Sequence, residues 1–118
     1  MPKLNQVNVN LVDSKDKKIA SYIVKRLNVR SAIRRENMFM NIQETEMSIR
    51  GQMFACASLA CTLYDEKDKL VFPEKDYPEN TAIDELFDYD YEVYLALSKA
   101  YLEVNPVAPT LSAKKKKS

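Results

Sequence analysis

A single glycine, Gly51, and no histidine occur in the 118 residues of this chain. The phosphate-binding loops of nucleotide enzymes need several glycines, because their backbone must approach the phosphate closely. Histidine is the commonest general base and the commonest metal ligand in proteins. The sequence therefore excludes glycine-rich nucleotide sites and histidine-based catalytic triads, and we predict no catalytic residue and no cofactor.

Cysteine is also scarce: Cys56 and Cys61 stand five residues apart in an apolar stretch with helical character. On a helix this spacing points the two side chains about 140° apart, which rules out a bridge between them within one helix. A structural zinc site needs about four ligands from paired motifs, and the chain contains no such motif. We predict two buried thiols and no metal site, as suits a reducing compartment.

A long hydrophobic run is missing as well. The first ten residues contain no apolar core of a signal peptide, and the longest apolar-rich stretch, Met53 to Tyr64, is too short to cross a bilayer. The prediction is an intracellular protein that is neither secreted nor membrane-spanning.

The residues that are present are typical of a small globular protein, with 46% hydrophobic and 30% charged residues. The scarcity of glycine favours helices over a turn-rich β fold. We predict a mainly α (α+β) fold, in which an N-terminal β-hairpin packs on a small bundle of about four helices. Residues 1–106 are expected to form a single domain, and residues 107–118, which lack periodicity and end in lysines, a flexible tail.

Alternating apolar and polar residues mark the predicted hairpin. Val7, Val9 and Leu11 alternate with asparagines, as in a half-buried strand. Residues 13–16 are turn-forming, and residues 18–27, rich in β-branched side chains, are predicted to form the return strand.

The first two helices are predicted from capping residues and apolar spacing. Asn28 is the expected N-cap of the first helix, and Asn41 with Glu44 forms a capping-box pattern that opens the second. On the first helix, the apolar face is expected to hold Val29, Ala32, Ile33 and Met40, while Arg30, Arg34 and Arg35 point away. The second helix is predicted to run to about Tyr64 and, being apolar almost all round, to form the centre of the core.

The C-terminal half is divided by a charged loop that contains two prolines and is held by one apolar anchor, residues 70–72. Thr81 begins a short third helix. The last helix is predicted to be capped by Asp88 or Asp90 and to stop at Asn105.

Charge is distributed unevenly along the chain. Residues 1–50 contain ten Lys or Arg against five acidic residues, and residues 51–113 contain four against twelve. The close succession of Arg26, Arg30, Arg34 and Arg35 could bind nucleic acid. A solvated helix face is the alternative, and the lack of interleaved aromatic residues or a known binding motif favours it.

Five carboxylates lie between residues 84 and 92, and in principle they could hold calcium or perform acid-base chemistry. Their spacing does not match the twelve-residue calcium loop. Carboxylates are also favoured at helix N-termini by the helix dipole, and capping explains these residues better.

Tyrosines surround the start of the last helix. Tyrosine is favoured at protein interfaces because its ring buries area while its hydroxyl stays paired or hydrated. Tyr94 and Tyr101, seven residues apart on one helix face, fit the core as well as an interface. Tyr89 and Tyr91 are better interface candidates than Tyr101.

The order of elements over residues 5–106 carries a family resemblance. After the hairpin come a helix opened by LNVRSAIRREN, a buried apolar helix, the segment CTLYDEKDKLVFPEKD and a last helix DYEVYLALSKAYLEVNP. This order resembles the phage tail assembly chaperones. In that family an acidic pair, a turn and an apolar clasp follow the buried helix, and the last helix ends in a leucine- or valine-rich turn with asparagine. The corresponding segments here are residues 64–66, 70–72 and 102–105.

The lysine run Lys114 to Lys117 is compatible with a further property of this family. Its genes often make a second, extended product by frameshifting on a run of repeated bases, and four lysine codons can form an adenine-rich run. A solubilising tail or a remnant of cloning explains the lysines equally well.

The resemblance implies a non-enzymatic, self-associating protein of the host cytoplasm. It would coat the tape measure protein before the tail tube polymerises, and its extended form would recruit tail tube protein. The protein-binding residues predicted for this role are Phe72, Phe87, Tyr89, Tyr91 and Leu95. The alternatives are a small nucleic-acid-binding regulator and another virion morphogenesis component, such as a connector.

Overall fold

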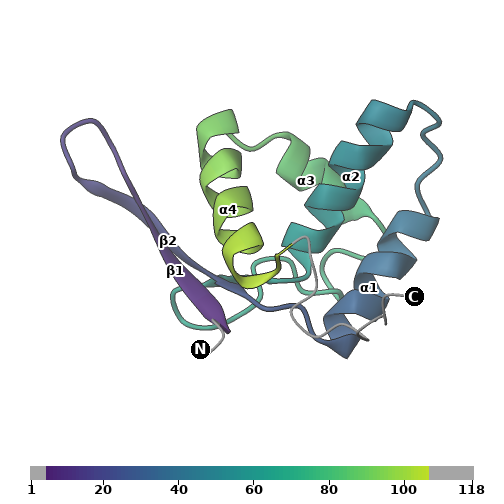
Figure 1. Ribbon diagram of the computed structural model, residues 1–118, viewed down its shortest axis with the longest axis horizontal. Coiled ribbons are helices and arrows are strands. Elements are labelled where there is room, and N and C mark those ends of the chain that lie inside the picture. Colours follow the sequence, from purple (N-terminus) through teal and green to yellow (C-terminus); the bar gives the residue numbers. More distant parts are fainter. Residues whose placement is uncertain (1–4, 107–118) are drawn as a thin grey trace, which may run out of the picture.

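The computed structural model describes residues 5–106, which form an α+β fold of four helices and a three-stranded antiparallel sheet (Figure 1). The elements in chain order are β1 (Gln6–Val12), β2 (Lys18–Lys25), α1 (Val29–Met40), α2 (Met47–Ala60), β3 (Leu63–Asp65), α3 (Thr81–Phe87) and α4 (Tyr91–Val104). The predicted hairpin and four helices are confirmed, and the sheet has one strand more than the sequence pattern predicts. The predicted tail, residues 107–118, lies outside the described residues.

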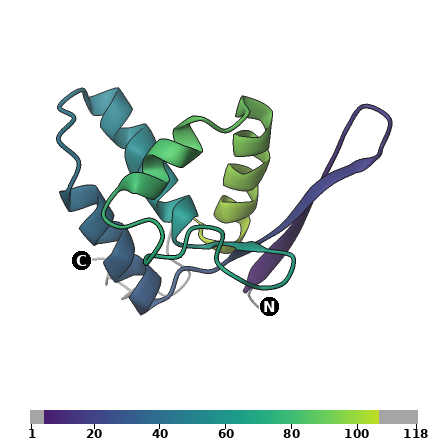
Figure 2. The same cartoon turned by 180° about the vertical axis from the view of Figure 1, so that it is seen from behind.

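β1 and β2 form the hairpin, whose turn projects away from the helices (Figures 1 and 2). Val7 lies opposite Val24 and Val9 opposite Tyr22, so that apolar side chains share one face of the pair. These side chains pack against the core, and α4 contacts both strands. β2 ends at Lys25, two residues before its predicted end.

β3 occupies a segment for which the sequence pattern predicts helix. α2 ends at Ala60, and the Thr62 hydroxyl donates a hydrogen bond to the carbonyl oxygen of Ser58 at 2.9 Å. Tyr64 then pairs with Ile23 of β2, so the prediction of helix to about Tyr64 was wrong. A three-residue strand has no period to detect, and it forms because β2 provides a pairing edge.

α1 begins as predicted but turns a different face to the core. Asn28 caps it, and its side chain accepts a hydrogen bond from the backbone N–H of Ser31 at 2.8 Å. The buried residues of α1 are Arg34 and Met38, and its exposed apolar residues are Val29, Ile33 and Met40. The predicted inward position of these three apolar residues and the predicted outward position of Arg34 were therefore wrong, whereas Arg30 is exposed as predicted. Apolar residues occur on several sides of this helix, and spacing alone does not choose among them.

α2 begins at Met47, well after its predicted N-cap Asn41. The Glu44 carboxylate does not reach back to residue 41, but accepts a hydrogen bond from the backbone N–H of Glu46 at 2.9 Å. Ile42 is buried, which anchors the irregular connection between the two helices. The predicted capping box at Asn41 and Glu44 was wrong, because Asn41 is the C-cap of α1 and Glu44 lies in the connection before α2 begins.

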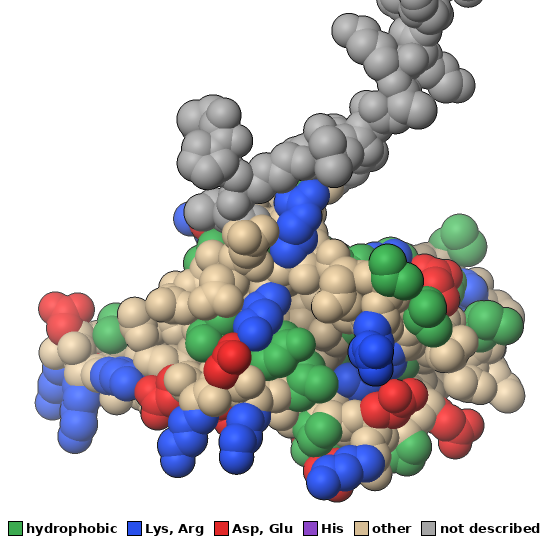
Figure 3. Space-filling model, turned by 90° about the horizontal axis from the view of Figure 1, so that it is seen from below, with side chains coloured by type: hydrophobic (Ala, Val, Ile, Leu, Met, Phe, Trp, Pro, Cys, Tyr) green, Lys and Arg blue, Asp and Glu red, His purple; other side chains and the backbone are tan. Residues whose placement is uncertain are grey.

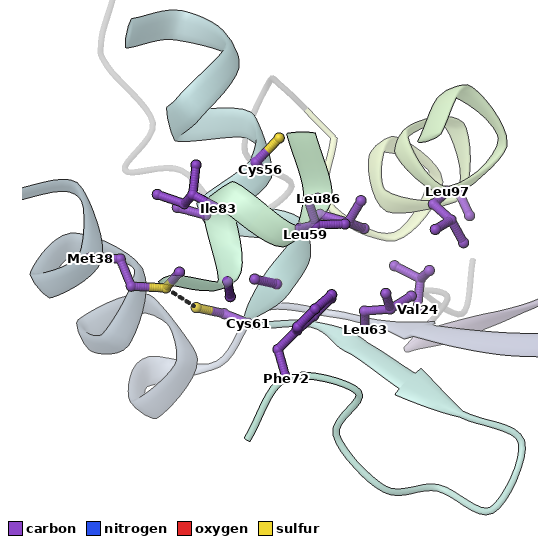
Figure 4. Close-up of a cluster of buried hydrophobic side chains, with 14 of the residues drawn as sticks. Val24, Met38, Cys56, Leu59, Cys61, Leu63, Phe72, Ile83, Leu86 and Leu97 are labelled. Carbon is purple, nitrogen blue, oxygen red and sulfur yellow. Dashed lines mark hydrogen bonds between the residues drawn. The ribbon is translucent and has the colours of Figure 1, made fainter. Parts of the chain in front are cut away.

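The C-terminal part of α2 lies at the centre of the core, as predicted (Figure 4). Around it pack Leu63 of β3, Phe72 of the following loop, Ile83 and Leu86 of α3, and Leu97 of α4. Cys56 and Cys61 are buried free thiols, which confirms their predicted burial. The Cys61 sulfur lies 3.6 Å from the sulfur of Met38, so that α1 and the end of α2 meet through two polarisable atoms.

Both ends of α4 are fixed by side-chain hydrogen bonds. Asp90 is the N-cap, as predicted, and its carboxylate accepts from the backbone N–H of Glu92 at 3.1 Å. At the other end, Asn105 accepts from the Leu27 N–H at 2.7 Å and donates to the Lys25 carbonyl oxygen at 3.2 Å. The last helix is thereby tied to the end of β2. Within residues 5–106, no helix combines the length and the apolar character needed to span a bilayer.

Candidate protein-binding surface

A small pocket opens where α2, α3 and the start of α4 meet. Its volume is about 170 Å³, and its lining residues are Gln52, Cys56, Leu86, Phe87, Tyr89, Tyr91 and Tyr94. The lining contains aromatic rings, one thiol and one amide, but no charged side chain. The pocket therefore offers a partner a mostly apolar surface with a few hydrogen-bonding groups.

Three of the predicted binding residues come together at this pocket. Phe87 ends α3, Tyr91 begins α4, and Tyr89 lies in the turn between them. Tyr91 is 70% exposed and Phe87 48% exposed, whereas Tyr89 is half-buried. The exposed rings of Phe87 and Tyr91 lie beside the same pocket, and together they form an apolar surface that a partner can cover.

Leu95 extends this surface along α4 without lining the pocket. It follows Tyr91 by one helical turn, and both side chains lie on the same exposed side of the helix. Leu102, seven residues further on, is also exposed. These three residues form an apolar stripe, which we call the α4 stripe.

Phe72 does not belong to the binding surface, contrary to the prediction. Its side chain is 2% exposed and lies in the core, which leaves no area for a partner. The Phe72 ring contacts Tyr77 edge-on, with ring centroids 5.0 Å apart, and lies 6.1 Å from the ring of Tyr89. Phe72 thus supports the pocket from beneath, through Tyr89, because the loop that carries it folds inward.

A second hollow lies between α2 and α4. Its volume is about 400 Å³, and it is bounded by Phe54 and Ser58 of α2 and by Tyr101 and Leu102 of α4, among others. Tyr94 lines both hollows and is their common wall. The two hollows and the α4 stripe make one side of α4 a candidate docking surface.

Burial keeps Cys56, Tyr89 and Tyr94 of the first pocket neutral at physiological pH. Burial raises the pKa of the Cys56 thiol to about 11, and a hydrogen bond with Tyr94 offsets part of this rise. Burial also raises the pKa of Tyr94 and of Tyr89, and the neighbouring Tyr22 raises that of Tyr89 further. A protonated thiol is a poor nucleophile, so burial leaves Cys56 unactivated for covalent chemistry.

Five carboxylates neighbour the pocket-lining residues of α3 and α4 along the chain, and we call them the acidic rim. Asp84, Glu85, Asp88, Asp90 and Glu92 are all exposed, on α3, on the turn after it and on the first turn of α4. Asp90 caps α4, which fits the capping explanation, and among residues 5–106 no three Cys, Asp or Glu side chains are grouped as a metal site requires. An apolar pocket with such a rim suits a partner that has apolar anchors flanked by Lys or Arg.

The arginines of the first segment do not form a continuous basic surface. Arg26 donates to the last carbonyl oxygen of α4 at 3.1 Å, Arg34 is buried, and the Arg35 guanidinium lies 4.8 Å from the centroid of the Phe54 ring. Of the four arginines, Arg30 alone is exposed. On the face drawn in Figure 3, basic and acidic side chains are interspersed, with no large area of one sign. The described arginines therefore give little support to a nucleic-acid interface.

Several residues of this surface were not predicted from the sequence: Gln52, Cys56, Leu86, Tyr94 and Leu102. Tyr94 fits the core and an interface equally well by its spacing, and in the structure it is half-buried, packs against the core and lines both hollows. Leu102 could have been found as the continuation of the spacing between Tyr91 and Leu95. Gln52 has no such signal, since its place depends on how α2 and α4 are arranged.

Comparisons with known proteins identify no relative of this chain. No family model matches the sequence, and neither the curated proteins nor the solved structures contain a match.

Proposed function

We propose that this chain is a non-enzymatic tail assembly chaperone, which binds a phage tape measure protein in the host cytoplasm and keeps it soluble until the tail tube assembles. The observation that carries the proposal is the tyrosine-lined pocket, with the acidic rim on the same two helices and the α4 stripe beside it. These features add to the resemblance in the order of the helices and the hairpin.

The client in this proposal is an amphipathic helix. Such a helix places apolar anchors at positions i, i+3, i+4 and i+7 along one side, a pattern that fits shallow hollows arranged along a helix. One anchor would enter the pocket next to Phe87 and Tyr91, and a later one would pack along Leu95. Basic residues of the client would meet the acidic rim and speed association, an effect that weakens as salt is added.

The lining supports binding without catalysis. The thiol of Cys56 is the pocket's strongest potential nucleophile, and its raised pKa of about 11 keeps it protonated. An extended frameshift product that recruits tail tube protein belongs to the same proposal.

The direct test is co-expression with the tape measure protein encoded beside this chain's gene. The wild-type chain should move most of that protein from the pellet to the soluble fraction. The variant Phe87→Ser/Tyr91→Ser should lose most of this effect, because it removes the two exposed aromatic rings next to the pocket. An unchanged pellet with the wild-type chain contradicts the proposed function.

A matched control removes exposed apolar area elsewhere. Val29 and Met40 are 77% and 80% exposed on α1, so Val29→Ser/Met40→Ser changes a comparable surface on another helix. This control should solubilise the client as well as the wild type does. If both double variants act alike, the client binds elsewhere and the assignment of the surface is wrong.

A further inference from the structure

Among residues 5–106, the outer edge of β1 has no strand partner. The strand order is β1-β2-β3, which makes β1 an edge strand over all seven of its residues. Such an edge presents a row of backbone N–H and C=O groups that can pair with another strand.

Two hydrogen bonds establish which groups of β1 point outward. The Arg26 N–H donates to the Asn5 carbonyl oxygen at 2.8 Å, and continuing the register places these two residues opposite each other. Bonded and non-bonded pairs alternate along an antiparallel ladder, so the odd-numbered residues of β1 bond to β2. On the other side of β2, the Lys25 N–H donates to the Thr62 carbonyl oxygen at 3.0 Å, which fits the same alternation. The residues whose backbone groups point away from β2 are Gln6, Asn8 and Asn10.

β1 also lacks the usual protection of an edge strand. Natural edges are commonly blocked by lysine, by proline or by a bulge. The strand QVNVNLV contains no charged residue and no proline, and its one irregularity, between Leu11 and Val12, falls at the end next to the turn. The five residues from Val7 to Leu11 therefore form an uncharged, regular edge.

We propose that β1 pairs antiparallel with β1 of a second copy of this chain, about a two-fold axis at Val9. The segment Val7-Asn8-Val9-Asn10-Leu11 reads nearly the same in both directions, apolar opposite apolar and asparagine opposite asparagine. Val9 faces Val9 of the second copy, Val7 faces Leu11 of the second copy, and Asn8 faces Asn10 of the second copy. A two-fold dimer requires this kind of self-complementary patch.

The hydrogen-bond alternation agrees with this register. Asn8 and Asn10 direct their backbone groups outward and would form bonded pairs across the axis, while Val9 falls in a non-bonded pair, where side chains approach most closely. Val7, Val9 and Leu11 are half-buried in the single chain, so a second copy covers apolar area that remains in water. Because β1 is uncharged, no like charges oppose each other across the contact.

The pairing does not depend on the proposed chaperone role, and charge substitution on the full chain tests it. Asn8 and Asn10 are exposed, so lysine or glutamate at these positions leaves the apolar face of the hairpin intact. In the proposed register, Asn8→Lys/Asn10→Lys sets lysines opposite lysines. Asn8→Glu/Asn10→Glu does the same with acids. A mixture of the two variants sets lysine opposite glutamate at each pair.

Sedimentation velocity over a range of concentrations should give twice the chain mass for the wild type, the single-chain mass for each charged variant, and twice the chain mass again for the mixture. In the wild-type dimer, amide exchange at Asn8 and Asn10 should be roughly tenfold slower or more than in the variants. Gln43→Lys/Thr45→Lys, at exposed sites between α1 and α2, should remain dimeric.

Three outcomes would overturn the proposal. A wild-type chain that stays monomeric has no such contact. Charged variants that still dimerise use another surface. Slow exchange at Asn8 and Asn10 in a monomer means that another segment of the same chain covers the edge. Recovery of the dimer in the mixture supports both the contact and its register.

Discussion

The Tyr94 hydroxyl of α4 donates a hydrogen bond to the side-chain oxygen of Gln52 of α2, at 3.2 Å. This bond joins the two helices where the two hollows meet, since Tyr94 lines both of them. Cys56 and Ser98 also lie within hydrogen-bonding reach of the same hydroxyl. This contact adds to the core packing that sets the spacing between α2 and α4, and with it the shape of the candidate docking surface.

Tyr94→Phe keeps the ring and removes this bond. The free energy of unfolding should fall by about 0.5–1.5 kcal/mol, the usual range for one hydrogen bond, and nearer the low end because the bond is exposed. Denaturant titration measures the loss. Tyr91→Phe, which changes an exposed hydroxyl one turn earlier, should leave stability unchanged; equal stability of both variants would show that the Tyr94 bond contributes nothing.

Arg34→Met should leave the protein as stable as the wild type or stabilise it by about 1 kcal/mol or more. Arg34 is 9% exposed, its Nε and Nη1 atoms have no hydrogen-bond acceptor, and its Nη2 atom lies 3.5 Å from the Tyr77 carbonyl oxygen. Methionine fills a similar volume without a buried charge. Thermal unfolding measures the change, with Arg30→Met on the exposed side of α1 as control. A marked loss of stability in Arg34→Met alone would mean that the guanidinium has a strong partner in solution.

Asn105→Ala should lower the free energy of unfolding by about 1–3 kcal/mol, because it leaves the Leu27 N–H and the Lys25 carbonyl oxygen without their partner in a partly buried site. Chemical denaturation gives the value. Asn37→Ala, at an exposed position of α1, is the control and should have little effect. Equal effects of the two substitutions would contradict a specific role for Asn105 in fixing α4 to β2.

The two buried thiols should make the protein less stable at alkaline pH. The pKa of Cys56 and that of Cys61 are each raised from 9.0 to about 11, mainly by burial. Between these pH values the unfolded chain loses the thiol protons while the folded chain keeps them, so stability falls as pH rises. The loss is on the order of 2 kcal/mol per thiol.

The test compares the slope of unfolding free energy against pH, from pH 8 to 11, in the wild type and in Cys56→Ala/Cys61→Ala. The double variant should show a shallower slope, and its overall stability should be lower at every pH because two buried side chains have been shortened. Parallel slopes in the two proteins would contradict the raised pKa values.

Several features specified by neighbours in the sequence were predicted correctly, although the local capping-box pattern at Asn41 and Glu44 was not. The strand that contains Val7 and Val9 follows from the alternation of apolar and polar residues. The N-caps Asn28 and Asp90 accept hydrogen bonds from backbone N–H groups no more than three residues later in the chain. These signals require no knowledge of the rest of the fold. Asn105 was likewise a correct stop signal, although its bonds to β2 were not foreseeable from the sequence.

Features that depend on distant segments were missed. β3 exists because β2 lies beside it, and Arg34 is buried because other elements pack over a side of α1 that its sequence does not distinguish. The residues of the candidate surface also include some that the sequence predicts and some that only the packing explains. Phe87 and Tyr91 were predicted from their residue type and position, whereas Gln52 and Phe72 depend on how α2 and the loop are packed.

The contact between α4 and the hairpin joins the first and last described elements of the chain (Figure 1). Its sequence separation is nearly as great as the described chain allows, and contacts of this kind slow folding because a long loop must close before they form. During synthesis, the apolar face of the hairpin would have no helix to cover it until residues 91–104 had left the ribosome. Until then the cell would hold an incomplete chain with an open strand edge and an uncovered face, and this interval is when aggregation competes most strongly with folding.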